Sequence, residues 1–380
     1  MNLSKMPDPA VQGRDLRLDF VRGLANWFML LDHIPHNAVN LLTLRNFGFS
    51  GATDLFVFTA GYAAAMIYGR LMWERGFVVA ATRIFRQAWR LYAAYIVLFV
   101  LYVNAIGFVA TQSAADALIG EYNVIGMIDH PVRMLAHGLS LQTRVLNLDA
   151  LQLFIALLAG FPLVLACMIR WPNLTMFASI ALYAAARQFD WSLSAFPDGT
   201  WYFNPFCWQL LFVFGAWFSL AGKQVGGLYR LPALRIAALL YLVFGLAVTI
   251  ATHSPRLGAL VPPFMLDAFA PDNRENLAPH RVLHFLALAF MFTWLVPRDW
   301  PGFQSKMLRP IIICGEEWLA AFCAGVLLSF AGHFVLITGP DSLAMQVLVS
   351  VAALMLMTGV AYYIAWSRRQ DRISAVGAKA

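Results

Sequence analysis

The sequence predicts an all-α, polytopic integral membrane protein with about ten transmembrane helices. Of its 380 residues, 61% are hydrophobic and only 12% are charged, and the mean hydropathy is +0.67. The apolar residues are gathered into runs of roughly the 17–25 residues that a helix needs to cross a bilayer. Soluble domains rarely combine so little charge with so many long apolar runs.

The predicted spans follow one another along the whole chain, with no internal repeat and no low-complexity tract. We therefore expect one membrane domain over residues 1–380. The shortest span ends at Arg187 and is the one whose full crossing is left open. The ten spans are residues 18–38, 51–69, 91–111, 149–169, 172–187, 205–222, 234–252, 281–297, 316–334 and 345–366.

Lysine and arginine residues predict how these spans are oriented. With ten spans and a cytoplasmic N-terminus, most of the 27 Lys and Arg residues fall in cytoplasmic segments, as the positive-inside rule requires. Segments 1–17 and 367–380 would then be cytoplasmic, and two longer loops, about 112–148 and 253–280, would face outward. The net charge of +7 is therefore a topology signal, and no nucleic-acid-binding motif accompanies it.

The sequence contains no recognised metal or cofactor motif. Cys167, Cys207, Cys314 and Cys323 lie in or beside apolar spans without CxxC spacing, which favours small buried hydrophobic residues over a disulfide framework. No HExxH, P-loop or strand-linked GxGxxG is present. We expect neither a metal site nor a tightly bound cofactor.

Arg22 and His33 form the most informative pair in the chain. They are eleven residues apart in the first span, which is about three helical turns, so both side chains share one face and lie roughly 16 Å apart along the axis. Ionisable groups inside a membrane helix are costly and mark a functional site by default. His33 suits a general base or a nucleophile, and Arg22 suits binding of a charged ligand.

Other polar residues extend this pair into a stripe. Asp19, Asn26 and Asn37 fall on the same face of the predicted helix. A polar seam between packed helices is the simpler explanation of such a stripe, but five polar residues on one face favour function. Asp32 is about 100° away on the helix, so we expect it to pair with a neighbouring helix instead of orienting His33.

Several segments resemble the OpgC family, the membrane succinyltransferases of osmoregulated periplasmic glucans. The first resemblance runs from Arg14 to Leu24 and continues through Asp32-His33-Ile34-Pro35. It extends over most of the chain. The other matching segments are Leu44–Phe49, Asp54–Phe58, Gly61-Tyr62, Trp201–Gln209, Arg281–His284 and Gly315–Ser329. The Arg-x10-His spacing is also similar to that of the wider transmembrane acyltransferase (acyltransferase 3-like) superfamily. Where the family has Ser-Asp-Ala-x-Glu, this chain has Ser50-Gly-Ala-Thr-Asp54.

The resemblance implies an acyltransferase-type helical bundle in the bacterial inner membrane. Its donor would be cytoplasmic acyl-CoA, most simply succinyl-CoA, and its acceptor a periplasmic glucan or another saccharide. His33 would be catalytic, by direct base catalysis or through an acyl-enzyme. The lipid bilayer is the expected environment, no nucleic acid is expected, and the oligomeric state is open, with a homodimer as one option.

Further residues are candidates for binding, each with a simpler structural explanation. Arg83, Arg86 and Arg90 would join Arg22 in holding CoA phosphates, or would serve only as positive-inside charge. Trp208 would stack on a sugar or serve as an interfacial anchor, and Glu316 and Glu317 would favour a helix start. The substrate-binding candidates are Asn26, Arg45, Asn46, Asp54, Asn204, Trp208, Gln209, Arg281 and His284.

Two other functions remain open at this stage. One is transfer of acetyl or another acyl group to a different cell-envelope saccharide. The other is a proton-coupled secondary transporter that uses His33 and Arg22 as a relay. Transporters commonly show inverted repeats with matched pairs of broken helices, and the sequence shows no such pair.

Overall fold

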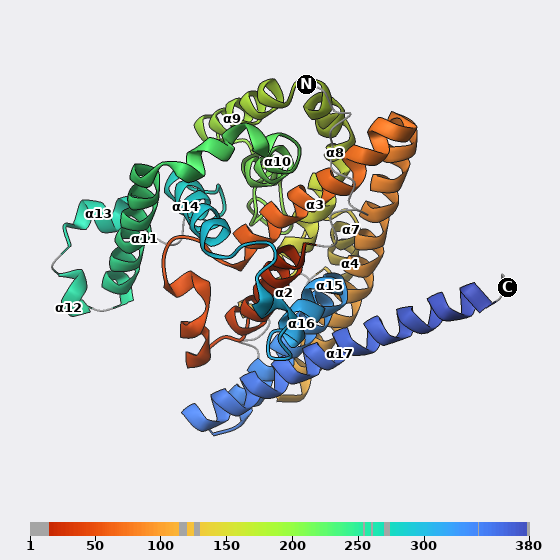
Figure 1. Cartoon of the computed structure of the whole chain (residues 1–380). Helices are drawn as coiled ribbons and strands as arrows, with labels where there is room; N and C mark the ends of the chain where they lie inside the picture. Colours follow the sequence, from red (N-terminus) through yellow and green to blue (C-terminus); the bar gives the residue numbers. More distant parts are fainter. Residues whose placement is uncertain are drawn as a thin grey trace. The chain divides into compact units, whose positions relative to one another are not determined.

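The structure is a computed structural model in which residues 15–113, 120–124, 130–253, 255–259, 261–269, 274–340 and 342–377 are described. Parts of both predicted outer loops, most of the predicted N-terminal segment and the last three residues lie outside these ranges. The described residues form helices joined by short turns, with only two isolated β-bridges among them (Figure 1). The all-α prediction is confirmed.

Each of the ten predicted spans coincides with one helix. The helices are α2 (Leu16–Asp32), α3 (Ala52–Arg75), α4 (Phe77–Ser113), α8 (Asp149–Arg170), α9 (Pro172–Gln188), α10 (Pro205–Ala221), α11 (Pro232–His253), α14 (Pro279–Leu295), α16 (Trp318–Thr338) and α17 (Leu343–Gly377). Shorter elements connect them. These are η2 (Ala38–Leu42), η3 (Leu44–Asn46), α7 (Pro131–Leu139), η4 (Gly222–Arg230), α12 (Pro255–Gly258), α13 (Pro263–Ala268), η5 (Pro301–Gln304) and α15 (Arg309–Glu316).

Six of these helices, α3, α4, α8, α11, α16 and α17, are long and apolar enough to cross a membrane. The protein is therefore a polytopic membrane protein. The other four, α2, α9, α10 and α14, have 17 residues each, or about 26 Å at 1.5 Å per residue. That length is close to the hydrocarbon thickness of a bilayer, and crossing by these four stays a prediction.

The first helix is shorter than predicted. We expected it to continue to residue 38, but α2 ends at Asp32, and His33 is its C-cap residue with φ −96° and ψ 3°. Pro35 explains the end, because proline lacks an N–H and its ring clashes with the preceding turn. The predicted continuation of the polar stripe to Asn37 is therefore wrong. Asn37 caps η2, and its side chain accepts a hydrogen bond from the Val39 N–H at 3.0 Å.

Two further predictions about local structure need correction. We expected Glu316 and Glu317 to begin a helix together, but Glu316 ends α15 and only Glu317 caps α16. We also expected Arg83, Arg86 and Arg90 in a cytoplasmic loop. They lie within α4, which begins at Phe77 because the segment before residue 91 is also largely apolar and contains no helix-breaking residue.

The chain divides into two compact units. Unit 1 comprises residues Met1–Thr59, Leu228–Phe269 and Leu283–Ala380, and unit 2 comprises Ala60–Gly227 and Ala270–Val282. In unit 1, α2 packs mainly against α15 and α16, and α17 packs along α16 (Figure 1). In unit 2, α8 packs against α4, α9 and α10, and α9 also packs along α10.

Glycine residues allow α2 and α15 to meet backbone to backbone. A Cβ atom added to Gly23 would lie 1.7 Å from the Ile311 carbonyl oxygen, and one added to Gly315 would lie 1.7 Å from the Asp19 carbonyl oxygen. Such small residues let membrane helices approach closely, where dispersion forces drive association. Around this contact lies a buried core that includes Leu30, Ile313, Cys314, Ala321, Ala353, Met357, Ala361 and Ala365.

We predict that Gly315→Ala destabilises the protein because its methyl group forces α2 and α15 apart. Such overpacking typically costs about 1–3 kcal/mol. Gly359→Ala on α17 is the control, since no atom lies within 4 Å of a Cβ there and alanine is the better helix former. Thermal unfolding in detergent measures both variants. Equal melting temperatures for the two variants would contradict the packing account.

Candidate active site

The polar residues of α2 are buried or half-buried in unit 1. Asp19 and Asn26 are buried, with 5% and 2% of their surface exposed. The half-buried Arg22 donates a hydrogen bond from Nη2 to the Thr59 carbonyl oxygen at 2.9 Å. This bond orients the guanidinium toward the start of α3. A guanidinium is well shaped to bind phosphate or carboxylate groups, which keeps Arg22 a candidate for binding an anionic ligand.

Asn26 joins α2 to the junction between α15 and α16. Its Nδ2 donates to the carbonyl oxygens of Cys314 at 3.2 Å and Trp318 at 3.3 Å. Carbonyl groups at a break between two helices lack some intrahelical partners, so the amide group of Asn26 has a structural role. Its buried Oδ1 atom has no hydrogen-bond partner among the described residues, which makes that oxygen the acceptor through which Asn26 can meet a ligand.

His33 stands at the end of α2, where the chain turns. It is half-buried, and its backbone N–H donates to the Met29 carbonyl oxygen at 3.1 Å. Arg22 and His33 are thus carried by one helix and its C-cap, about 16 Å apart along the axis by the helical rise. This arrangement places a half-buried cation and a half-buried imidazole at different depths along one rigid element.

The segment after His33 folds back onto the end of α2. Thr43 donates from Oγ1 to Asp32 Oδ1 at 2.5 Å, and Arg45 Nε lies 4.0 Å from the same oxygen. Asn46 donates from Nδ2 to the Asn40 carbonyl oxygen at 2.7 Å. Asn46 therefore helps to hold this loop, whereas Arg45 is half-exposed beside an acid and can reach a ligand.

A buried histidine in unit 1 bonds to a serine that the sequence analysis did not single out. Ser50 Oγ and His284 Nδ1 are 2.8 Å apart, and both side chains are buried. Two glycines make room for the imidazole, because a Cβ at Gly48 would lie 2.2 Å from His284 Nε2 and one at Gly245 would lie 2.8 Å from its Cδ2. Ser50 and His284 are 234 positions apart in the sequence, so residue spacing could not predict that they meet.

Two further candidates, Asp54 and Arg281, are buried as well. Asp54, at the start of α3, is 0% exposed, and its Oδ2 accepts a hydrogen bond from the Gly51 N–H at 2.8 Å. Arg281 lies three residues before His284 on α14 and is 6% exposed. The Asp54 bond favours a role in shaping the start of α3.

In unit 2, the candidates Asn204, Trp208 and Gln209 hold α10 to its neighbours. Asn204 caps α10, and its Nδ2 donates to the Trp191 carbonyl oxygen at 2.6 Å and to Asn276 Oδ1 at 2.8 Å. Trp208 is fully buried, and its Nε1 donates to the Arg274 carbonyl oxygen at 3.0 Å.

Gln209 exchanges hydrogen bonds with Ser179 of α9 at 2.6 and 2.9 Å. These bonds favour a structural role for all three residues. Full burial of Trp208 also argues against interfacial anchoring, which requires contact with the headgroup region.

Two groups of basic residues are candidates for phosphate binding. Arg83, Arg86 and Arg90 are exposed on α4 at spacings that put them on one face. At the N-terminal end of α2, Asp15 pairs with Arg17 at 2.9 Å and with Arg298 at 3.7 Å. The sequence analysis missed this second group of arginines, because Arg298 reaches α2 only in the fold.

The helices and their buried polar groups define a polytopic membrane protein with a polar site built around α2. A family model described as OpgC protein matches residues 14–369. The chain belongs to the OpgC family, and this membership indicates a membrane-embedded transferase. No curated protein and no solved structure matches the chain.

Proposed function

We propose that this protein transfers a succinyl group from cytoplasmic succinyl-CoA to a hydroxyl group of a periplasmic glucan. Membership in the OpgC family supports the transferase class. The observation that carries the proposal is the arrangement of α2, which holds Arg22 within the helix and His33 at its end. Donor and acceptor are on opposite sides of the membrane, so the reaction needs polar groups that line a path through the bilayer.

Arg22 is the proposed donor-binding residue. Its hydrogen bond to Thr59 orients the guanidinium, and charge-assisted bonds to phosphate are strong when partly desolvated. Arg17 and Arg298 add positive charge at the N-terminal end of the same helix. In unit 2, Arg83, Arg86 and Arg90 form an exposed basic face of α4 that is proposed to attract anionic CoA. The phosphopantetheine arm is long enough for the roughly 16 Å between Arg22 and His33.

His33 is the proposed catalytic residue. In the direct route, its imidazole takes the proton of a sugar hydroxyl while the hydroxyl oxygen attacks the thioester carbonyl. The C–S bond then breaks, an ester forms, and CoA leaves as a thiolate that receives the proton. In the second route, the imidazole nitrogen attacks the thioester carbonyl first, the C–S bond breaks, and CoA leaves with the proton of the ring N–H. The sugar hydroxyl then attacks the acyl-imidazole, the C–N bond breaks, and the departing imidazole takes the hydroxyl proton.

The succinyl preference is assigned to the loop after α2. Succinyl carries a free carboxylate that acetyl lacks, and Arg45 is a half-exposed guanidinium in this loop that suits a planar carboxylate. The buried Asn26 Oδ1 is a proposed acceptor for a sugar hydroxyl. Asn46, Asp54 and His284 of unit 1 are then proposed to shape the acceptor region.

The proposed location is the bacterial inner membrane, with both termini in the cytoplasm. The apolar helices support a membrane location, and the distribution of Lys and Arg supports the orientation. On this topology, the N-terminal end of α2 faces the donor and His33 lies toward the acceptor.

We predict that His33→Ala lowers acyl transfer by about 10²–10⁴-fold, as is typical for loss of a general base. The assay uses purified protein, labelled succinyl-CoA and a glucan extract. His130→Ala is the control, since His130 is exposed at the start of α7. Near-normal turnover in the His33 variant would exclude His33 from the mechanism. If the glucan is labelled by acetyl-CoA but not by succinyl-CoA, the donor assignment is wrong.

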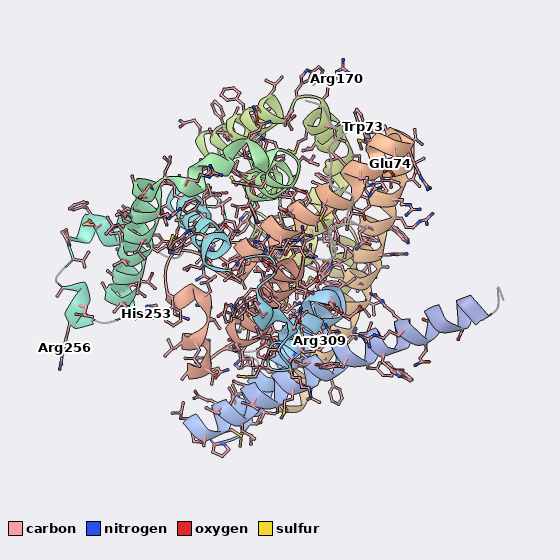
Figure 2. The ribbon with its side chains drawn as sticks, viewed as in Figure 1. Trp73, Glu74, Arg170, His253, Arg256 and Arg309 are labelled. Carbon is pink, nitrogen blue, oxygen red and sulfur yellow. The ribbon has the colours of Figure 1, made fainter. Side chains whose placement is uncertain are left out.

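Acyl-CoA affinity should depend on the shape of Arg22 as well as on its charge. Arg22→Lys keeps the charge but loses the planar fork, so it should weaken binding. Arg22→Ala should weaken it further, by up to about 3 kcal/mol for a desolvated charged contact. Arg256→Ala on α12 (Figure 2) is an exposed control. If both Arg22 variants bind acyl-CoA normally but lose acceptor binding, Arg22 faces the sugar and the proposed orientation is wrong.

A further inference from the structure

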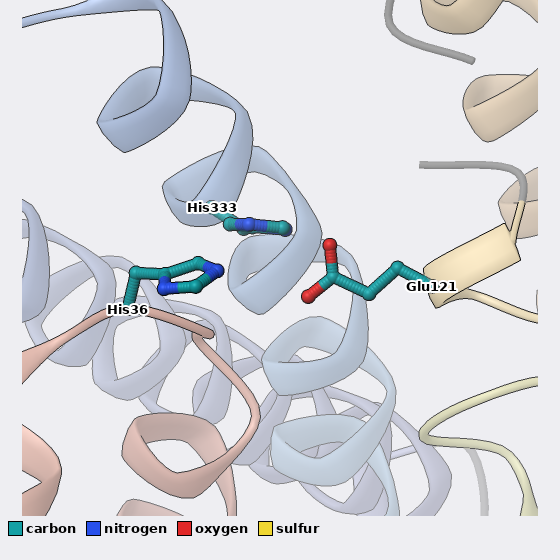
Figure 3. Close-up of side chains that lie close together, drawn as sticks. All are labelled: His36, Glu121 and His333. Carbon is teal, nitrogen blue, oxygen red and sulfur yellow. The ribbon is translucent and has the colours of Figure 1, made fainter. Parts of the chain in front are cut away.

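Two histidines of unit 1 lie close together beyond the end of α2. His36 is in the turn before η2, and His333 is on α16. Their ring centroids are 6.0 Å apart, and ring nitrogens of the two side chains lie within 4.8 Å of each other. Figure 3 shows the two imidazoles side by side.

His333 is an unusual residue for its position. It is only 1% exposed and lies in α16, which is long and apolar enough to cross a membrane. A histidine in such a helix is expensive to bury and is a functional candidate by default. His36, in contrast, is exposed, so the pair combines one buried imidazole with one exposed imidazole.

The turn that carries His36 is held in place on both sides. Asn37 donates from Nδ2 to Ser350 Oγ at 2.8 Å, and the Ala38 N–H donates to Gln346 Oε1 at 2.8 Å. Both acceptors are on α17. On the other side, a Cβ at Gly332 would lie 3.3 Å from Ile34 Cδ1, so the turn also packs against the residue preceding His333.

The backbone of His36 is itself constrained. Its φ angle is +55°, in the left-handed region that non-glycine residues adopt only rarely. Such conformations persist where the surrounding structure enforces them, and they cluster at functional sites. The contacts of the turn thus hold His36 beside His333 in a backbone conformation that is unfavourable for a non-glycine residue. Supporting contacts of this kind preorganise ligand sites.

We propose that His36 and His333 bind a divalent transition-metal ion, with zinc as the best match. Neutral imidazole is a favoured ligand of zinc, copper and nickel. Zinc–nitrogen bonds of about 2.0–2.1 Å place two ligand nitrogens about 3.4 Å apart in a tetrahedral site. The exposed His36 is the side chain whose adjustment would bring the two nitrogens to that separation. Water completes the coordination on the exposed side.

A bound ion would tie the turn after His33 to α16. His36 is three residues from His33, so occupancy of the site would restrict the end of α2. This inference does not depend on acyl transfer, and metal binding can be measured without any substrate. It replaces the expectation of no metal site, which rested on sequence motifs and cysteine spacing alone.

The test is metal titration of purified, chelator-treated full-length protein in detergent, produced without a histidine tag. Zn²⁺ binding is measured by calorimetry, and Co²⁺ binding by its visible absorption. We expect one ion per chain in the wild type and an affinity at least about tenfold lower in His36→Ala and His333→Ala, since even outer contacts of metal sites contribute 10–100-fold. His253→Ala, at the exposed end of α11 (Figure 2), should bind as the wild type does.

Thermal stability provides the second readout, because a ligand that binds only the folded state raises the melting temperature. Zn²⁺ should stabilise the wild type and His253→Ala but not His36→Ala. If His333→Ala fails to fold, the exposed His36 variant decides the question. The proposal is overturned if the wild type binds no Zn²⁺, or if the folded histidine variants bind it with unchanged affinity.

Discussion

The backbone contact between α2 and α15 at Gly23 and Gly315 is the interaction on which the rest of unit 1 depends. It brings the Asp19 and Ile311 carbonyl groups against glycine Cα atoms, an approach that any side chain would prevent. Because α2 carries Arg22 and is capped at its C-terminal end by His33, the same contact sets where these two side chains lie. Replacing either glycine by a residue with a side chain would therefore disturb both the core and the site.

The second constraint is the cost of placing polar groups among apolar helices. Three polar residues bond to groups that offset part of this cost. Arg22 bonds to the Thr59 carbonyl, Asn26 to two carbonyls at a helix junction, and His284 to the Ser50 hydroxyl. These partners lower the penalty of burial and also fix orientation. The same bonds thus serve stability and the geometry of the proposed chemistry.

Helix positions were predictable because long apolar runs leave a helix few alternatives in a bilayer. The end of α2 was predicted wrongly. Pro35 indicates a helix end, but the prediction followed the apolar character of the segment and extended the helix beyond it. Ser50 with His284, and His36 with His333, could not be paired from the sequence, since only tertiary packing brings them together. The Trp201–Gln209 segment was recognised as distinctive, but its hydrogen bonds to residues 274–276 show that a specific sequence can serve packing instead of ligand binding.

We propose that α2 links acyl-CoA on one side of the membrane with the glucan on the other side. The most direct measurement uses proteoliposomes of uniform orientation, with labelled succinyl-CoA on the side of the N-terminus and glucan only on the opposite side. The account predicts labelled glucan in this arrangement and a loss of label when the donor is moved to the acceptor side. Transfer that occurs only when donor and acceptor share one side would contradict it.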